Sequence, residues 1–327
     1  MKFNAMIVSE ENGKYIRRIE ERDIHDLPKN DVIINVKYSS LNYKDALSAI
    51  GNKGVTKNYP HTPGIDAAGI VYKSNSDRFK EGEEVIVTGY DLGMNTPGGF
   101  GQYISVPASW IIKKPDNLTL KDSMIFGTAG FTAALSIIQL EKYGLTQESG
   151  EILVTGATGG VGSMAVAMLA ASGYNVVAAT GKKDKEALLK SLGASQIIDR
   201  NEIDDESGKP MLRPRWGGVV DTVGGNILVT AIKSLKYGCS ATTCGLTKSH
   251  ELNLTVFPFI LRGVNLLGID SVEQPIETKE NVWKNISQRW NKDFVQNIYQ
   301  EVNLEELSDK IDLILKGQIA GRVVVKL

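Results

Sequence analysis

The stretch Glu151-Ile-Leu-Val-Thr-Gly-Ala-Thr-Gly-Gly-Val-Gly162 decides how this chain folds. Its apolar run, Ile152–Val154, predicts a buried parallel strand. A glycine-rich turn follows at 159–162, and residues 163–173 are helix formers closed by glycine. This order is typical of a dinucleotide site, because glycines let backbone N–H groups approach a pyrophosphate at the positive end of the helix. An ordinary tight connection between a strand and a helix is the alternative.

The composition bounds the class of protein. The chain has 327 residues, which allows two domains of about 150 residues each. Its hydrophobic share of 42% and charged share of 23% are ordinary for a globular protein. The 37 basic and 38 acidic side chains give a net charge of −1. No overall basic field would therefore attract nucleic acid or an anionic membrane, and we expect neither partner.

The cysteines and the apolar runs indicate a compartment. Cys239 and Cys244 lie in one apolar stretch, where we expect them in the core. Two cysteines form neither a disulfide framework nor a metal set, and they suit a reducing compartment. The N-terminal apolar run is too short for a signal peptide, and no run approaches the roughly 18 apolar residues of a membrane span. We therefore expect a cytoplasmic protein.

Residues 1 to about 120 favour a β-rich unit. Strand-like runs at 31–40, 69–72, 84–88 and 108–112 are separated by Gly, Pro, Asn and Asp. Short strands with frequent turn signals suggest a small Greek-key or barrel-like domain.

Helices and strands alternate from about residue 120 onward. Six strand-like runs are separated by helices or loops, which predicts a doubly wound parallel sheet and an α/β fold class. The strands are expected at 152–154, 175–180, 196–199, 218–223, 239–244 and 263–268, and helices at 119–126, 128–140, 163–171, 185–192, 227–235, 280–291 and 304–315. We place a closing strand at 321–327 back in the first domain, which makes that domain discontinuous.

The end of the second expected strand indicates which nicotinamide nucleotide binds. NAD-binding folds usually carry Asp or Glu there, about 20 residues after the glycines, to accept a hydrogen bond from the ribose 2′-OH. This chain has Thr180-Gly181-Lys182-Lys183 instead. A lysine beside a hydroxyl would hold a 2′-phosphate, which a carboxylate would repel. We predict Lys182 as the phosphate contact and Arg200 as a neighbour on the adenine side; solvated charges at a helix start are the alternative for the two lysines.

The ligands of a catalytic zinc are scarce. Zinc enzymes use Cys, His and carboxylate ligands to stabilise an alkoxide. The chain has three histidines and no cysteine before Cys239, and His61 stands in a turn between Pro60 and Pro63. A capped or solvated loop histidine is the simpler interpretation of His61. We therefore predict no metal site.

Polar residues at one strand end are candidates for the chemistry. Asn42, Tyr43, Lys44 and Asp45 follow the run at 31–40 and cannot all be core residues. Tyr43 could donate a proton or a hydrogen bond to a carbonyl, and Lys44 could stabilise enolate charge or pair with Asp45. A capped helix start with exposed charge is the alternative. Asp66, in a nearby turn-forming segment, could be purely structural.

The chain resembles the medium-chain dehydrogenase/reductase superfamily, and more narrowly its zinc-free quinone-oxidoreductase branch with the acryloyl-CoA reductases. The matching motifs run nearly end to end: 40–47 (SLNYKDAL), 63–69 (PGIDAAG), 127–133 (GTAGFTA), 154–162 (VTGATGGVG), 190–195, 220–225, 244–246, 257–262, 268–272 and 321–325 (GRVVV). Zinc-containing members carry a Cys near Asn42 and Gly-His-Glu where this chain has Gly64-Ile-Asp66, which agrees with the scarcity of ligands.

The resemblance implies a GroES-like β-rich catalytic domain (1–122 and 300–327) and a Rossmann NADP-binding domain (123–299). It places Tyr43 against the cofactor and makes it our candidate catalytic residue. The other cofactor contacts that it implies are Thr158, Gly159, Gly160 and Val161 at the pyrophosphate, Thr180, Gly181, Lys182 and Arg200 around the 2′-phosphate and adenine, and Leu246, Ile260 and Ser271 on the nicotinamide side.

The implied activity is NADPH-dependent reduction of an activated C=C bond or a quinone. In similar enzymes hydride goes to the β carbon and the enolate is protonated at the α carbon, and the acceptor is a small electrophilic alkene, an enoyl thioester such as acryloyl-CoA, or a quinone. Similar enzymes are usually dimers, and 254–260 (LTVFPFI) is an apolar candidate for the paired edge, or simple core. An NADPH-binding redox sensor or partner-binding protein with little turnover is the alternative function.

Overall fold

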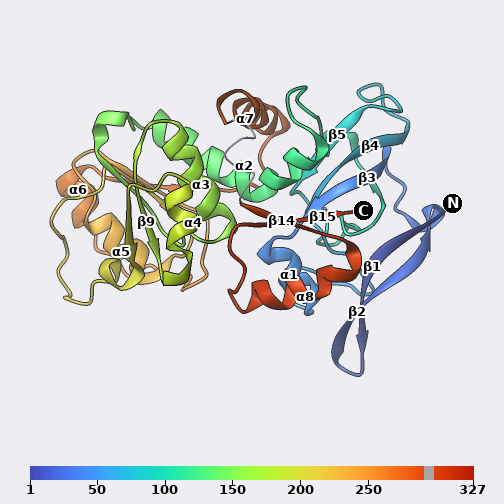
Figure 1. Cartoon of the computed structure of the whole chain (residues 1–327), viewed down its shortest axis with the longest axis horizontal. Coiled ribbons are helices and arrows are strands. Elements are labelled where there is room, and N and C mark those ends of the chain that lie inside the picture. The colour runs from blue at the N-terminus through green and yellow to red at the C-terminus, as the bar shows by residue number, and fades with distance from the viewer. Residues whose placement is uncertain (291–297) are drawn as a thin grey trace. The chain divides into compact units, whose positions relative to one another are not determined.

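The computed structural model describes residues 1–290 and 298–327, and contacts between residues divide the chain into two units (Figure 1). The first unit comprises Met1–Thr128, Val272–Ser287 and Tyr299–Leu327, and the second comprises Ala129–Ser271 and Gln288–Ile298. Residues 272–287 therefore group with the β-rich unit. The predicted domain boundaries near 122 and 300 remain a prediction, because contacts alone do not test which segments fold together.

The second unit is built on a six-stranded parallel sheet. Its strands are β8 (Glu151–Val154), β9 (Asn175–Thr180), β10 (Gln196–Asp199), β11 (Gly218–Asp221), β12 (Ser240–Thr243) and β13 (Asn265–Gly268). They lie in the order β10-β9-β8-β11-β12-β13, and each pair is parallel. Counted from β8 this is the order 3-2-1-4-5-6 of dinucleotide-binding folds. The predicted doubly wound sheet is confirmed.

Helices cover both faces of this sheet (Figure 1). They are α3 (Gly160–Ala171), α4 (Glu186–Ser191), α5 (Gly225–Lys233) and α6 (Phe257–Arg262). Apolar side chains of α5 such as Leu228 and Ile232 pack with Leu153 and Val219 of the central strands into one buried core. Such a core fixes the carboxyl ends of β8 and β9, where the predicted cofactor residues lie.

Helix α2 (Leu120–Lys142) joins the two units in sequence and is interrupted at Gly127. Gly127 has φ 50° and ψ −156°, which separates the two predicted helices at 119–126 and 128–140. By length and composition α2 could cross a membrane, so our expectation that no run is long enough was wrong. However, 83% of its most apolar window is buried inside the protein, as in the core helix of a soluble protein.

The first unit contains a seven-stranded sheet in the order β14-β15-β3-β4-β5-β7, with β6 paired to β3. The strands are β3 (Val32–Ser40), β4 (Asp66–Ser74), β5 (Glu84–Thr88), β6 (Tyr103–Val106), β7 (Ile111–Lys113), β14 (Tyr299–Val302) and β15 (Arg322–Lys326). Strand β15 is antiparallel to β3. The closing strand predicted at 321–327 thus belongs to this sheet.

Some elements of the first unit differ from the prediction. A hairpin of β1 (Lys2–Glu11) and β2 (Lys14–Asp23) forms a separate two-stranded sheet. Its second strand reads KYIRRIEERD, and no residue of it is buried, so it lacks the apolar alternation that marks a strand. The strand predicted at 108–112 is a 3₁₀ turn, Ala108–Trp110, followed by β7.

Three helices complete the first unit: α1 (Tyr43–Ala49), α7 (Ile276–Arg289) and α8 (Leu304–Leu315). Helix α8 has the predicted bounds, whereas α7 begins before the predicted 280–291, whose last residue lies outside the described residues. Lys279 of α7 is fully buried; its Nζ donates to the Thr88 carbonyl at 2.6 Å and lies 3.4 Å from the Tyr90 ring centroid. This cation contact ties α7 to the end of β5 and to Tyr90 in the β-rich unit.

Candidate functional sites

The glycine turn after β8 has no room for side chains at two positions. A Cβ at Gly162 would lie 2.3 Å from the Gly156 carbonyl oxygen, and one at Gly156, which has a positive φ of 57°, would lie 2.3 Å from the Thr222 hydroxyl. The turn therefore packs tightly against the start of α3 and the end of β11. Such a tight turn leaves the N-terminal amides of α3 for an anion, which is the geometry that a pyrophosphate needs.

Hydrogen bonds of Thr155 and Thr222 fix this turn to the end of β11. The Thr155 hydroxyl donates to Asp221 Oδ1 at 2.7 Å, and the Thr222 hydroxyl donates to the Thr155 carbonyl at 2.9 Å. The Gly224 N–H donates to Asp221 Oδ2 at 2.9 Å. Asp221 is fully buried, and burial raises its pKa. These bonds tie the ends of β8 and β11 together; the sequence reasoning did not single them out.

The residues predicted around a 2′-phosphate come together at the end of β9. The hydroxyls of Thr158 and Thr180 lie 3.4 Å apart, and the Lys182 N–H donates to the Thr180 hydroxyl at 3.1 Å. A Cβ at Gly181 would lie 2.8 Å from Arg200 Nε, so the Arg200 side chain packs over this glycine. Two cationic side chains thus flank one turn that contains no carboxylate of its own.

The environment of Lys182 differs from that of its neighbour Lys183. Lys182 is half-buried, and burial lowers the pKa of its ammonium group, with Asp184 acting in the opposite direction. Lys183 is exposed and begins the 3₁₀ turn Lys183–Lys185. A partly desolvated ammonium is better placed to hold a phosphate than a fully hydrated one.

Leu246, Ile260 and Ser271 lie in three separate segments of the second unit. Leu246 follows β12 and is 67% exposed, and Ile260 lies in α6 and is 69% exposed. Ser271 follows β13 and is half-buried. Their predicted place at the nicotinamide remains a prediction.

Cys239 and Cys244 are half-buried rather than full core residues. The Cys244 thiol donates to the Asp221 carbonyl at 3.3 Å, and burial, followed by the charge of Asp221, raises its pKa to about 12. Burial also raises the pKa of Cys239. Both sulfurs are thiols near neutral pH, which makes them poor metal ligands and poor nucleophiles.

Tyr43 is the first residue of α1 in the first unit. Tyr43 is 45% exposed, whereas Asp45, two residues along the same helix, is fully buried. Asp45 accepts hydrogen bonds from the backbone N–H groups of Asn42 (2.7 Å) and Ile65 (2.8 Å). The capped helix start that we considered as the alternative is therefore present, and it leaves the Tyr43 phenol facing outward.

Asp66 is the centre of a buried polar cluster next to this helix start. Its carboxylate accepts hydrogen bonds from the Ser40 hydroxyl (2.5 Å), the Asn42 amide (2.8 Å) and the Thr128 hydroxyl (2.5 Å) and N–H (2.9 Å). Arg322 lies 4.0 Å away. The sequence motifs 127–133 and 321–325 contain Thr128 and Arg322, but nothing local in them indicated that they meet Asp66.

The donor set at this position does not fit a zinc ion. The resemblance aligns zinc ligands with Asn42 and with the segment Gly64-Ile-Asp66, which here offers an amide, an apolar side chain and one carboxylate. That carboxylate is already saturated with hydrogen-bond donors and faces a guanidinium. Within residues 1–290 and 298–327, no three His, Cys, Asp or Glu side chains come together as metal ligands.

His61 is buried rather than solvated. Its Nε2 lies 2.9 Å from the Gly93 carbonyl, and its ring meets Tyr59 edge-on at a centroid distance of 6.5 Å. Burial lowers the pKa of the imidazole. It serves the packing of its turn, as a neutral histidine with a satisfied ring nitrogen does.

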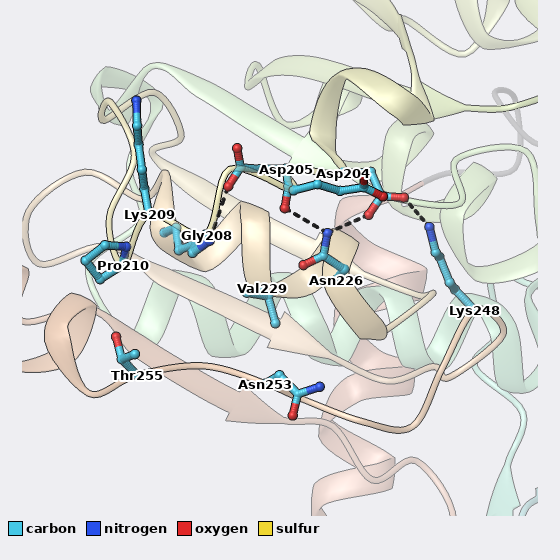
Figure 2. Close-up of a pocket in the computed structure, with 12 residues that line it drawn as sticks. Asp204, Asp205, Gly208, Lys209, Pro210, Asn226, Val229, Lys248, Asn253 and Thr255 are labelled. Carbon is cyan, nitrogen blue, oxygen red and sulfur yellow. Dashed lines mark hydrogen bonds and ion pairs between the residues drawn. The ribbon is translucent and has the colours of Figure 1, made fainter.

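A cavity of about 500 Å³ opens in the second unit, and none of the predicted cofactor residues lines it. Figure 2 shows the Asn226 amide between Asp204 and Asp205, with Lys248 paired to Asp204. Lys233 pairs with Asp205 at 3.2 Å. The charges of these walls cancel in pairs, so the cavity favours neither an anion nor a cation.

Known proteins share both units. Residues 28–116 match the family model of the alcohol dehydrogenase GroES-like domain, and residues 160–288 match that of the zinc-binding dehydrogenases. Acrylyl-CoA reductase AcuI of Ruegeria pomeroyi is 43% identical over 99% of this chain and 98% of its own length.

Two solved structures superpose on the whole chain. The yhdH oxidoreductase of Salmonella enterica, in complex with NADP, is 38% identical with a TM-score of 0.97, and the yhfP protein of Bacillus subtilis, with NAD bound, is 45% identical with a TM-score of 0.98. Both comparisons cover 100% of each chain. The chain therefore belongs to the medium-chain dehydrogenase/reductase superfamily. Within it, the chain groups with the yhfP and AcuI proteins, as the sequence motifs predicted.

Proposed function

We propose that this chain is a zinc-independent, NADPH-dependent oxidoreductase that reduces small electrophilic alkenes, enoyl thioesters or quinones. The choice of NADPH rests on the turn after β9. There Lys182 and Arg200 flank a position that holds a carboxylate in NAD-binding folds. The NADP complex of yhdH supports this nucleotide, and the name of acrylyl-CoA reductase AcuI supports an enoyl thioester as acceptor.

The residues present fit a dinucleotide. The turn at 156–162 packs tightly on the protein at Gly156 and Gly162, and the N–H groups at the start of α3 would bind the oxygens of the pyrophosphate. Thr158 and Thr180 would add hydroxyls, and Lys182 would neutralise the 2′-phosphate with help from Arg200. When bound, NADPH supplies a hydride to the acceptor.

The chain's own part in the chemistry is to polarise the acceptor. Tyr43 would donate its phenolic hydrogen bond to the acceptor carbonyl, which draws charge from the alkene and stabilises the enolate oxygen that forms. Its outward-facing ring at the start of α1 makes this contact available. Lys44, half-buried beside it, would add positive charge on the same helix turn.

The assay that tests the activity follows NADPH absorbance with acryloyl-CoA, simple enones and benzoquinones as acceptors. We expect NADPH to be consumed with at least one of these classes. Binding of NADPH without turnover across the whole panel would overturn the proposal and favour a redox sensor.

The role of Tyr43 has its own test. We expect Tyr43→Phe to lower kcat by about tenfold or more, since a positioned hydrogen-bond donor or acid contributes this much or more, while the affinity for NADPH stays the same. Tyr72→Phe, a change in a similarly exposed tyrosine of β4, is the matched control. Full turnover in Tyr43→Phe would remove its side chain from the mechanism.

We also propose a homodimer in the cytoplasm. Val256, Phe257, Ile260 and Leu261 expose apolar side chains on α6 and just before it, whereas Pro258 is buried, so the predicted apolar segment is only partly core. Strand β13 is an edge strand of the parallel sheet. Exposed apolar residues and a strand that lies at the sheet edge among the described residues suit a second copy. The two free thiols fit a reducing compartment.

A further inference from the structure

Arg322 connects β15 with α2, with β3 and with the residues just before α1. It is the first residue of β15 and is 3% exposed. Its Nε donates to the Ile125 carbonyl at 3.0 Å, on the turn of α2 just before Gly127. Its Nη2 donates to the Ser40 hydroxyl at 2.8 Å, at the end of β3.

The third nitrogen of the guanidinium acts on the residues directly before Tyr43. Nη1 donates to the Leu41 carbonyl at 3.3 Å and to Asn42 Oδ1 at 3.2 Å. The amide nitrogen of Asn42 donates to Asp66 Oδ2 at 2.8 Å. Asn42 is therefore held between a buried cation and a buried anion, and neither end of its amide is left for a substrate.

The geometry around Gly127 shows how closely this cluster is built. A Cβ there would lie 2.5 Å from the Ser40 hydroxyl, 2.6 Å from Asp66 Oδ2 and 2.8 Å from Arg322 Nη2. Only glycine allows α2 to approach the cluster and to aim the Thr128 N–H at Asp66. The break in α2 thus completes the set of donors around the carboxylate.

The zinc-containing members that the sequence resembles carry a Cys near Asn42 and Gly-His-Glu at 64–66, whereas here Asn42 and Asp66 face a guanidinium. Arg322 supplies the positive charge opposite Asp66, at 4.0 Å, and its planar fork reaches several acceptors at once. An ammonium could replace the charge but could not serve the carbonyls of Ile125 and Leu41 together with Ser40 and Asn42 in one plane.

We infer that Arg322 is a positioning residue for reduction. It fixes Leu41 and Asn42, and through them it sets the direction in which the Tyr43 side chain projects from the first turn of α1. The inference rests on the proposed function, in which Tyr43 contacts the acceptor. Because Arg322 is buried and its guanidinium is bonded to protein groups, we expect it to act through Tyr43 and not by touching the acceptor.

The test compares Arg322→Lys and Arg322→Ala with Arg17→Lys and Arg17→Ala. Arg17 is a matched control in the same unit, because it donates to a carboxylate, Asp312, at 2.7 Å and to a backbone carbonyl, Ser308, at 3.2 Å, without approaching α1's first turn. Thermal unfolding identifies the variants that fold, and binding of NADPH to the second unit serves as a reference.

We expect both Arg322 variants to lose about tenfold or more in kcat with unchanged NADPH affinity. Guanidinium ion at non-denaturing concentration should restore part of the activity of Arg322→Ala and none of the activity of Tyr43→Phe. The Arg17 variants should lose stability without losing kcat. A folded Arg322→Lys protein with kcat within twofold of the wild type would overturn the inference.

A readout without turnover separates this inference from the proposed function. In protein labelled with fluorotyrosine, the ¹⁹F resonance that is missing from Tyr43→Phe identifies Tyr43. We expect Arg322→Lys to shift or broaden that resonance and Arg17→Lys to leave it unchanged. An unchanged Tyr43 resonance in folded Arg322→Lys would refute the positioning role even in a protein that reduces nothing, whereas a wild type without turnover would refute only the proposed function.

Discussion

Lys182 stands where a carboxylate would otherwise select NADH, so changing its charge should change the choice of nucleotide. We expect Lys182→Glu to raise the KM for NADPH by roughly 10- to 100-fold, since a hydrogen bond between charged groups is worth about 1.5–3 kcal/mol. The KM for NADH should change little or fall. Steady-state kinetics with both nucleotides and one acceptor measure the ratio.

The neighbouring lysine provides the control for this change. Lys183 carries the same charge but is exposed, so Lys183→Glu should alter the NADPH-to-NADH ratio by less than about threefold through long-range charge alone. Equal effects of the two substitutions would show that general electrostatics, rather than a contact at Lys182, selects the nucleotide.

The buried carboxyl of Asp45 should make stability depend on pH. Its pKa is raised to about 7, first by burial and then by the charge of Asp66. In the unfolded chain an aspartate has a pKa of about 3.9. Between this pKa and the native pKa, the native state therefore binds more protons than the unfolded state. The stabilisation that Asp45 provides is therefore complete at low pH and is lost as pH rises through about 7.

Asp45→Asn cannot ionise and should remove this dependence. The wild type should lose stability as the pH rises from about 5 to about 8, and Asp45→Asn should not. The free energy of unfolding of Asp45→Asn minus that of the wild type should therefore increase by roughly 2–3 kcal/mol over this range. Urea unfolding at the two pH values measures the difference. A difference that is the same at both would mean that Asp45 titrates normally in the native protein.

At the scale of single elements, the interruption of α2 at Gly127 is the feature whose substitution should change stability most clearly. Gly127 and Gly144 both have a positive φ, at 50° and 92°, but an added Cβ would collide only at Gly127, whereas Gly144 has nothing within 4 Å. Gly144→Ala should therefore report the backbone cost alone, about 1 kcal/mol.

Gly127→Ala adds displacement of Ser40, Asp66 or Arg322 to that backbone cost. We expect it to lower the free energy of unfolding by at least about 2 kcal/mol more than Gly144→Ala does. Parallel denaturant titrations provide the comparison. If both substitutions lower the free energy of unfolding equally, the side chains around Asp66 can move to accept the added methyl group without loss of stability.

Elements with a local signal could be predicted from the sequence. Helix α8 has the bounds predicted from the sequence, and in the structure Asn303 caps it while Leu304, Leu307 and Ile311 are buried. The hairpin of β1 and β2 was not recognised because β2 is rich in charged residues, has no buried residue and shows no apolar alternation. The glycine turn was recognised because strand, turn and helix are contiguous in the chain.

The cluster around Asp66 could not be predicted in the same way. Its members come from β3, β4, α2 and β15, and Ser40 and Arg322 are 282 residues apart. Only the pairing of β15 with β3 brings them together. The sequence therefore indicated Tyr43 as a candidate but could not show what holds it, since that depends on tertiary contacts between distant segments.

At the scale of the whole molecule, the exposed apolar residues of α6 should decide the oligomeric state. Val256 and Leu261 are 64% and 57% exposed. We expect the double change Val256→Asp and Leu261→Asp to convert a dimer into a folded monomer, because buried unpaired carboxylates oppose association. Analytical ultracentrifugation measures the mass, and Tyr143→Asp, on a 47% exposed residue elsewhere in the second unit, is the control. A wild-type monomer would refute the homodimer.

The place of Arg322 in the last strand has a consequence for biosynthesis. The strands of the parallel sheet, from β8 to β13, are consecutive in the chain, so the ribosome delivers that sheet complete before β15 exists. Ser40 and Asp66 are synthesised early, whereas their cationic partner Arg322 is among the last residues to be synthesised. The set of charged and polar partners around Asp66 can therefore be completed only after the last strand of the chain has been synthesised.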